Sequence, residues 1–154
     1  SSDVCSSDLV LRPYSRGQIR LASRDPSASP LIDPGFLSDE RDMDTMVQGF
    51  KLTRQLMDAP VFQNIRSREV FTSRAQTDQD IRDLIRQRAD TVYHPVGTCK
   101  MGNDAMAVVD RNLKVHGIEG LRVVDGSIMP TLVGGNTNAP IIAIAEKAAD
   151  MIRC

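Results

Sequence analysis

Residues 38–59 carry apolar side chains at the three- and four-residue spacing that an α-helix buries on one face. These side chains are Met43, Met46, Val47, Phe50 and Met57. Ser38 suits the N-cap, and Pro60 ends the pattern because proline has no backbone N–H. The spacing predicts a helix over these residues, with its apolar face in the core.

A second helix is predicted after Thr77. The Thr77 hydroxyl and the Asp80 carboxylate have the spacing of a capping box, in which each side chain bonds the other residue's backbone N–H. The apolar stripe that follows comprises Ile81, Leu84 and Ile85. The pattern ends near Asp90, so this helix is short.

The last predicted helix covers residues 138–152. Asn138 suits its N-cap, and Pro140 suits its first turn, where no intrahelical donor is needed. The positive end of the helix dipole then lies at Asn138 and favours a negative or electron-rich group. The simpler interpretation is that Asn138 only caps the helix.

The remaining segments predict short strands and loops. Residues 10–21 alternate apolar and basic positions, which predicts two short strands or a strand that enters a turn. Three prolines and several polar residues predict an extended loop over residues 23–34, and two glycines and Pro95 predict a loop over residues 93–102. Residues 107–110, 113–115 and 121–124 read as short extended runs. The first nine residues have no usable period and are predicted to be a non-native or disordered tail.

Composition narrows the class of protein. The chain has 154 residues, 41% of them hydrophobic, and a formal charge of −1, which is ordinary for a globular domain and gives no field that would attract nucleic acid. No apolar run approaches the roughly 20 residues of a transmembrane helix. Three widely spaced cysteines argue against a disulfide framework and against a Cys-rich zinc site, so we expect no metal. These features predict a cytoplasmic protein, with peripheral membrane association left open.

The candidate chemistry rests on few residues. The chain contains none of the common dinucleotide, phosphate-loop, hydrolase, zinc-protease or C-x-x-C motifs. His94 lies in a glycine-rich loop, and an imidazole there suits a general base, although a surface histidine is the simpler interpretation.

Five segments, taken in order, resemble the C-terminal part of the glucose-methanol-choline oxidoreductases, in their choline and alcohol dehydrogenase branch. They read LRPYSRGQIRLAS, PLIDPGFLSD, YHPVGTCKMG, AVVDRNLKVHGIEGLRVVDGSIMPTLVGGNTNAP and IAEKAADMI. The resemblance implies a flavoprotein that oxidises a primary alcohol, choline-like or aliphatic, to an aldehyde by hydride transfer to FAD.

The resemblance also implies roles for particular residues. His94 matches the catalytic base that takes the hydroxyl proton, and Asn136 matches the partner that holds the substrate oxygen. The family pattern places Asp125 and Gly126 near the FAD phosphate and ribityl chain. It also places the amides of Asn138 and Ala139 at the pyrimidine edge of the flavin.

The family's glycine-rich dinucleotide fingerprint is absent from this sequence, so the resemblance implies a fragment of mixed α/β (α+β) class. Residues 10–92 would belong to the antiparallel-sheet substrate-binding domain, and residues 93–154 to the doubly wound FAD-binding domain. An N-terminal FAD-binding half would then be the missing partner. We expect the chain alone to hold FAD weakly and to have little activity.

Two alternatives stay open at this stage. Related folds include FAD-dependent lyases, in which the same histidine moves a proton and no hydride is transferred. The second alternative is a non-catalytic interaction module, which only binds a partner.

Overall fold

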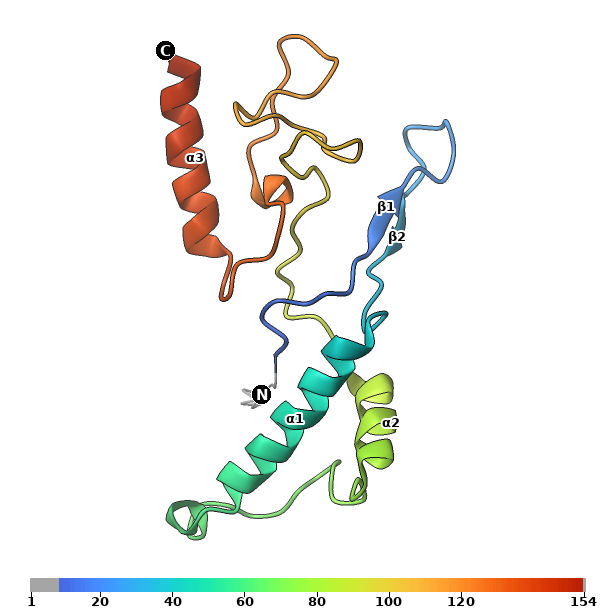
Figure 1. Cartoon of the computed structure of the whole chain (residues 1–154), viewed down its shortest axis with the longest axis vertical. Helices are drawn as coiled ribbons and strands as arrows, with labels where there is room; N and C mark the ends of the chain where they lie inside the picture. The colour runs from blue at the N-terminus through green and yellow to red at the C-terminus, as the bar shows by residue number, and fades with distance from the viewer. Residues whose placement is uncertain (1–8, 154) are drawn as a thin grey trace. The chain divides into compact units, whose positions relative to one another are not determined.

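The computed structural model describes residues 9–153, which form two compact units (Figure 1). Residues 9–16 and 35–90 make the first unit, and residues 17–34 and 91–153 make the second. Most of the predicted N-terminal tail, with Cys5, and the terminal Cys154 lie outside the described residues. Within residues 9–153 the secondary structure includes a two-stranded antiparallel sheet and three α-helices, a mixed α/β content as predicted.

The first unit contains the predicted helix α1 (Glu40–Met57). Its cap is Asp39, one residue later than predicted, and the Asp39 carboxylate accepts a hydrogen bond from the Arg41 amide at 3.0 Å. The same carboxylate pairs with the Arg41 guanidinium, which lowers the pKa of Asp39 to about 2. The helix ends before Pro60, which opens the short 3-10 turn η1 (Pro60–Phe62).

Helix α2 (Asp78–Arg88) begins with the predicted capping box. The Asp80 amide donates to Thr77 Oγ1 at 3.1 Å, and the Thr77 amide donates to Asp80 Oδ2 at 2.8 Å. Two of the orphan donors at the helix start are thereby satisfied without tertiary help. The prediction of this helix and of its cap is confirmed.

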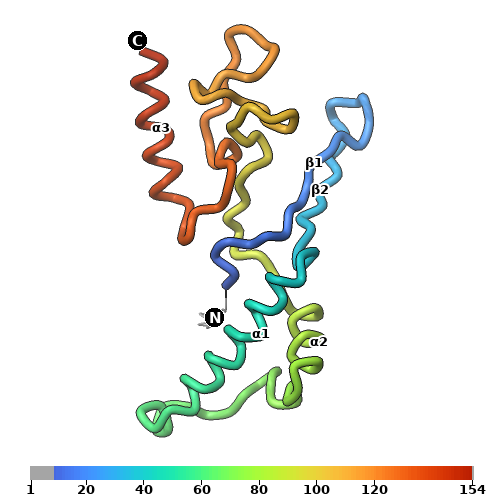
Figure 2. The backbone as a smooth tube through the Cα atoms, in the orientation of Figure 1, coloured from blue at the N-terminus to red at the C-terminus, as the bar shows by residue number. Residues whose placement is uncertain are grey.

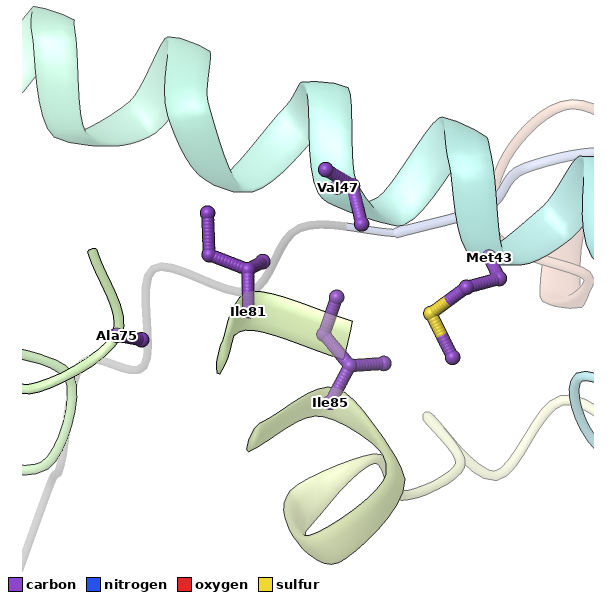
Figure 3. Close-up of a cluster of buried hydrophobic side chains, with 5 residues drawn as sticks. All are labelled: Met43, Val47, Ala75, Ile81 and Ile85. Atoms are coloured by element: carbon purple, nitrogen blue, oxygen red, sulfur yellow. The ribbon is translucent and has the colours of Figure 1, made fainter. Parts of the chain in front are cut away.

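The apolar stripes of α1 and α2 face each other and form the core of the first unit (Figure 3). The buried side chains are Met43, Val47, Ala75, Ile81 and Ile85. Burying an aliphatic side chain of this size contributes about 1.5–3 kcal/mol, so this cluster is the main apolar contribution to the stability of the unit.

A buried carboxylate fastens the segment before residue 17 to α1. Asp42 is 2% exposed and accepts hydrogen bonds from the amides of Tyr14, at 2.9 Å, and Ser15, at 2.8 Å. The Asp39 amide donates to Ser15 Oγ at 3.1 Å, so each segment bonds the other. Burial opposes ionisation of Asp42, but the hydrogen bonds from Ser15 and Tyr14 outweigh it and keep its pKa below the ordinary value.

The second unit contains a hairpin of β1 (Gln18–Arg20) and β2 (Leu31–Asp33), with Ile19 opposite Ile32. The first strand agrees with the prediction for residues 10–21. The prediction of an uninterrupted loop over residues 23–34 is wrong. Pro30 and Pro34 stand just outside the three paired residues, so their missing donors do not interrupt the ladder.

Between residues 91 and 137 the backbone follows long loops (Figure 2). Isolated bridges pair Met101 with Val109 and Val109 with Val115. The predicted strand over residues 121–124 is wrong, because a single bridge between Lys114 and Arg122 is all the pairing it has in the described structure. The turn after it is present as the 3-10 turn η2 (Gly126–Ile128).

Helix α3 (Asn138–Arg153) starts one residue earlier than the predicted cap at Asn138 implies. The Ile141 amide donates to the Thr137 carbonyl at 3.0 Å, so Thr137 occupies the N-cap and Asn138 the first helical position. Ala148 of α3 is buried in a core cluster with Val109, Leu113 and Ile128. No helix among residues 9–153 is long and apolar enough to cross a membrane.

Candidate active site

The loop that carries His94 is tied to the turn η2 by backbone hydrogen bonds. The Cys99 amide donates to the Ser127 carbonyl at 3.0 Å, and the Met101 amide donates to the Ile128 carbonyl at 2.8 Å. Gly97 allows the loop to turn, because its φ of +86° is a conformation that residues with a Cβ rarely adopt. The loop is therefore fixed along one side of η2.

His94 reaches the start of α3. Its Nδ1 lies 3.0 Å from Thr137 Oγ1, a hydrogen bond between residues 43 positions apart in the sequence. Thr137 is buried and His94 is half-buried. With Nδ1 engaged, Nε2 is the ring nitrogen available to a ligand. The preceding Tyr93 has a φ of +61°, a strained conformation for a non-glycine residue.

Gly126 brings the third part of the site into contact. It is buried, and a Cβ at this position would lie 3.1 Å from Ile141 Cδ1 and 3.8 Å from Val96 Cγ1. A glycine here lets η2 approach both the His94 loop and the first turns of α3. These three segments thus form one cluster within the second unit.

The other predicted site residues lie at the edges of this cluster. Asn136, Asn138 and Ala139 are exposed at the start of α3, on both sides of Thr137. His94 contacts Thr137 and forms no hydrogen bond with Asn136 in the described part of the chain. Asp125 is exposed and caps η2, since its carboxylate accepts from the Ser127 amide at 2.7 Å.

Thr137 is the residue that reasoning from the sequence missed. The N-cap preference scale ranks asparagine above threonine, so it points to Asn136 or Asn138 rather than to Thr137. Pro140 offered a signal, because it suits the third position of a helix that starts at residue 138. The contact with His94 has no local signal at all.

The cluster offers donors and one titratable base. The first amides of α3 have no intrahelical acceptor and lie at the positive end of the helix dipole, so they suit an anionic or electron-rich ring edge. The half-buried imidazole of His94 can act as a general base toward a hydroxyl within hydrogen-bond reach. Residues 9–153 hold no group of three or more His, Cys, Asp or Glu side chains arranged for a metal.

Replacing Gly97 with alanine tests the geometry of the loop. We expect a loss of unfolding free energy of more than about 1–2 kcal/mol, the cost of a left-handed alanine, because the new Cβ also lies 3.3 Å from the Met129 carbonyl oxygen. Gly117→Ala is the matched control, since Gly117 has a φ of +74° and no atom within 4 Å of the added Cβ. Equal losses in chemical denaturation would contradict the close approach to Met129.

Comparison with known proteins identifies the family. The family described as GMC oxidoreductase matches residues 13–145. The chain is 53% identical over 143 residues to the alcohol dehydrogenase [acceptor] of Pseudomonas putida, with 92% of this chain and 26% of that protein covered. It is 47% identical over 146 residues to oxygen-dependent choline dehydrogenase 1 of Chromohalobacter salexigens, with 93% and 26% covered. The chain thus spans about a quarter of the length of these relatives.

Solved structures agree with the sequence comparison. The pyridoxine 4-oxidase from Mesorbium loti matches with a TM-score of 0.85 and 34% identity, covering 91% of this chain and 28% of that one. An FAD-dependent oxidoreductase from Chaetomium thermophilum matches with a TM-score of 0.84 and 30% identity, covering 92% and 25%. The resemblance seen in the sequence is confirmed: the chain belongs to the GMC oxidoreductase family.

Proposed function

We propose that this chain supplies the catalytic base and part of the cofactor site of an enzyme that oxidises a primary alcohol, choline-like or aliphatic, to an aldehyde with FAD. The observation that carries the proposal is the hydrogen bond between His94 and Thr137, which holds a half-buried imidazole at the residue between Asn136 and Asn138. The names of the relatives, an alcohol dehydrogenase and a choline dehydrogenase, support the substrate class.

FAD would be held by the two edges of the cluster. Asp125 and Gly126 at η2 would approach its phosphate and ribityl chain. The free amides of Asn138 and Ala139, at the start of α3, would bond the pyrimidine edge, where the helix dipole stabilises negative charge. When bound, FAD supplies the acceptor for the hydride that leaves the alcohol carbon.

The proposed work of the chain's own residues is to move one proton and to orient one oxygen. His94 takes the hydroxyl proton at Nε2, which raises the electron density on the oxygen and on the carbon that carries it. The exposed carboxamide of Asn136 donates a hydrogen bond to that oxygen as its negative charge develops. Both groups act by holding the alcohol in one orientation, which replaces a costly bimolecular encounter.

The proposal requires additional polypeptide. The chain spans 26% of the Pseudomonas putida relative, and none of its residues matches a dinucleotide fingerprint. We propose that residues 10–92 serve the substrate-binding domain, that residues 93–154 serve the FAD-binding domain, and that an N-terminal FAD-binding half completes the site. Ile142 and Ile152 on α3 are more than half exposed, which supports a further partner for this helix.

A chimera tests the proposal. The chain replaces the matching part of the Pseudomonas putida alcohol dehydrogenase, and the purified protein is desalted and examined for bound flavin. We expect stoichiometric FAD in the chimera, bleached by an aliphatic primary alcohol or by choline without oxygen, and little flavin on the chain alone.

Each outcome decides one part of the proposal. Stoichiometric, bleachable flavin on the isolated 154-residue chain would show that no further half is needed. A chimera that holds FAD but is bleached by neither alcohol would exclude alcohol oxidation, and proton transfer without flavin reduction would then favour a lyase.

A further inference from the structure

We propose that Thr137 is a positioning residue, which holds His94 in the tautomer with its proton on Nδ1 and thereby leaves Nε2 as the base. The catalytic consequence rests on the proposed function. The choice of tautomer rests on it too, because the 3.0 Å contact fits either direction of the hydrogen bond, but the tautomer is measured without any activity assay.

The hydroxyl of Thr137 is unusually free for a residue at a helix cap. A capping hydroxyl ordinarily accepts from the backbone N–H of the second or third helical residue. Here the third helical residue is Pro140, which has no N–H, so one of the two ordinary donors is missing and only the Ala139 amide is left. The hydroxyl instead lies 3.0 Å from His94 Nδ1, in a residue that is 4% exposed. Few water molecules can reach it, so His94 has little competition for this partner.

The direction of this hydrogen bond decides whether His94 can act as a base. A threonine hydroxyl can donate or accept, and a neutral imidazole carries one proton. If Thr137 donates to Nδ1, the imidazole proton lies on Nε2, which then has no lone pair for the alcohol proton. If Nδ1–H donates to Thr137, Nε2 is free to accept. After Nε2 gains its proton, the Nδ1–H bond to Thr137 remains in place.

The second histidine of the chain provides an internal reference. His116 Nε2 lies 3.0 Å from the carbonyl oxygen of Gly102. A carbonyl only accepts, so neutral His116 carries its proton on Nε2. The proposal therefore assigns opposite tautomers to the only two histidines in the sequence.

Nitrogen NMR of the full chain, labelled with ¹⁵N-histidine, measures the tautomers directly. At a pH where both rings are neutral, we expect a protonated Nδ1 in His94 and a protonated Nε2 in His116, with His116→Ala used for assignment. In Thr137→Val, we expect the His94 proton to redistribute toward Nε2. Thr137→Ser keeps the hydroxyl and should restore the wild-type pattern.

Two results would overturn the proposal. One is a wild-type His94 with its proton on Nε2. The other is a His94 tautomer that is unchanged in Thr137→Val. The His116 signal shows whether the Thr137→Val variant has kept its fold. If this variant is unfolded, the spectra of the wild type and of Thr137→Ser alone test the proposed tautomer.

Kinetics of the chimera test the consequence for catalysis. Partners that orient a metal-bound histidine are worth about 10–100-fold in activity, and we expect a similar fall in the rate of flavin reduction for Thr137→Val. KM should change little, and Thr137→Ser should recover most of the rate. A full rate in Thr137→Val would refute the positioning role, whereas a full rate in a variant without His94 would refute the proposed function, and the nitrogen spectra would still decide the tautomer.

Discussion

Replacing His94 with alanine is expected to lower the rate of flavin reduction by a primary alcohol by about 100- to 10,000-fold, the usual contribution of a general base. Without an imidazole near Asn136, the hydroxyl proton must pass to water, and the oxygen cannot gain negative charge as the hydride leaves. The proposed FAD contacts come from η2 and α3 rather than from His94, so FAD should stay bound.

The measurement is anaerobic stopped-flow bleaching of the flavin in the chimera, with flavin content determined for each variant. His116→Ala is the matched control, because it removes an exposed histidine that bonds a backbone carbonyl outside the cluster. The alanine at position 94 also leaves the buried Thr137 hydroxyl without its partner, so thermal unfolding of both variants is compared. An unchanged rate in His94→Ala would remove this residue from the mechanism.

The helices were predictable because their signals are local. Thr77 and Asp80 form their capping box within one turn. The apolar stripe of α2 that follows can be recognised from its own spacing, without knowledge of distant residues. The caps of α1 and α3 each fell one residue from the predicted position. Ser38 and Asp39 have similar cap preferences, and Asn138 ranks above Thr137. In both helices the observed cap residue also makes a tertiary hydrogen bond, which the local sequence does not show.

The strands were less predictable because pairing is not local. β2 exists because Leu31–Asp33 pairs with Gln18–Arg20. The prolines on either side of β2 favoured the prediction of a loop instead. Residues 121–124 have the composition of a strand but find one bridge in the described structure. In this run Val123 and Val124 pack partly buried against the second core cluster while Leu121 is exposed, so the apolar composition alone establishes neither a strand nor full burial.

The site also combines residues that the sequence indicated with residues that it did not. Family resemblance pointed to His94 and Asn136, and their roles stay predictions. Thr137 could not be found from the sequence, because its importance rests on a contact across 43 residues. Asp42 was missed for the same reason: an acidic residue in the first turn of a helix is explained by the helix dipole alone, and nothing nearby shows that it is buried.

Replacing Asp42 with alanine is expected to lower the free energy of unfolding by about 2–4 kcal/mol at neutral pH. The change leaves the amides of Tyr14 and Ser15 without their acceptor in a site that is 2% exposed, and each hydrogen bond to a charged group is worth about 1.5–3 kcal/mol. Asp42→Asn keeps the shape and one acceptor oxygen, so its loss should be smaller. Urea denaturation of the chain measures both.

The pH dependence separates the charge of Asp42 from its shape. Because folding lowers the pKa of Asp42, its charge stabilises the chain above the ordinary value of 3.8, and this contribution is lost as the pH falls through the lower, folded value. The gap in stability between wild type and Asp42→Asn should therefore narrow below about pH 3.8. Asp44→Asn is the matched control on the same helix, since its exposed ion pair with Arg82 is worth less than about 1 kcal/mol. A gap that stays constant with pH would show that Asp42 acts through packing rather than through its charge.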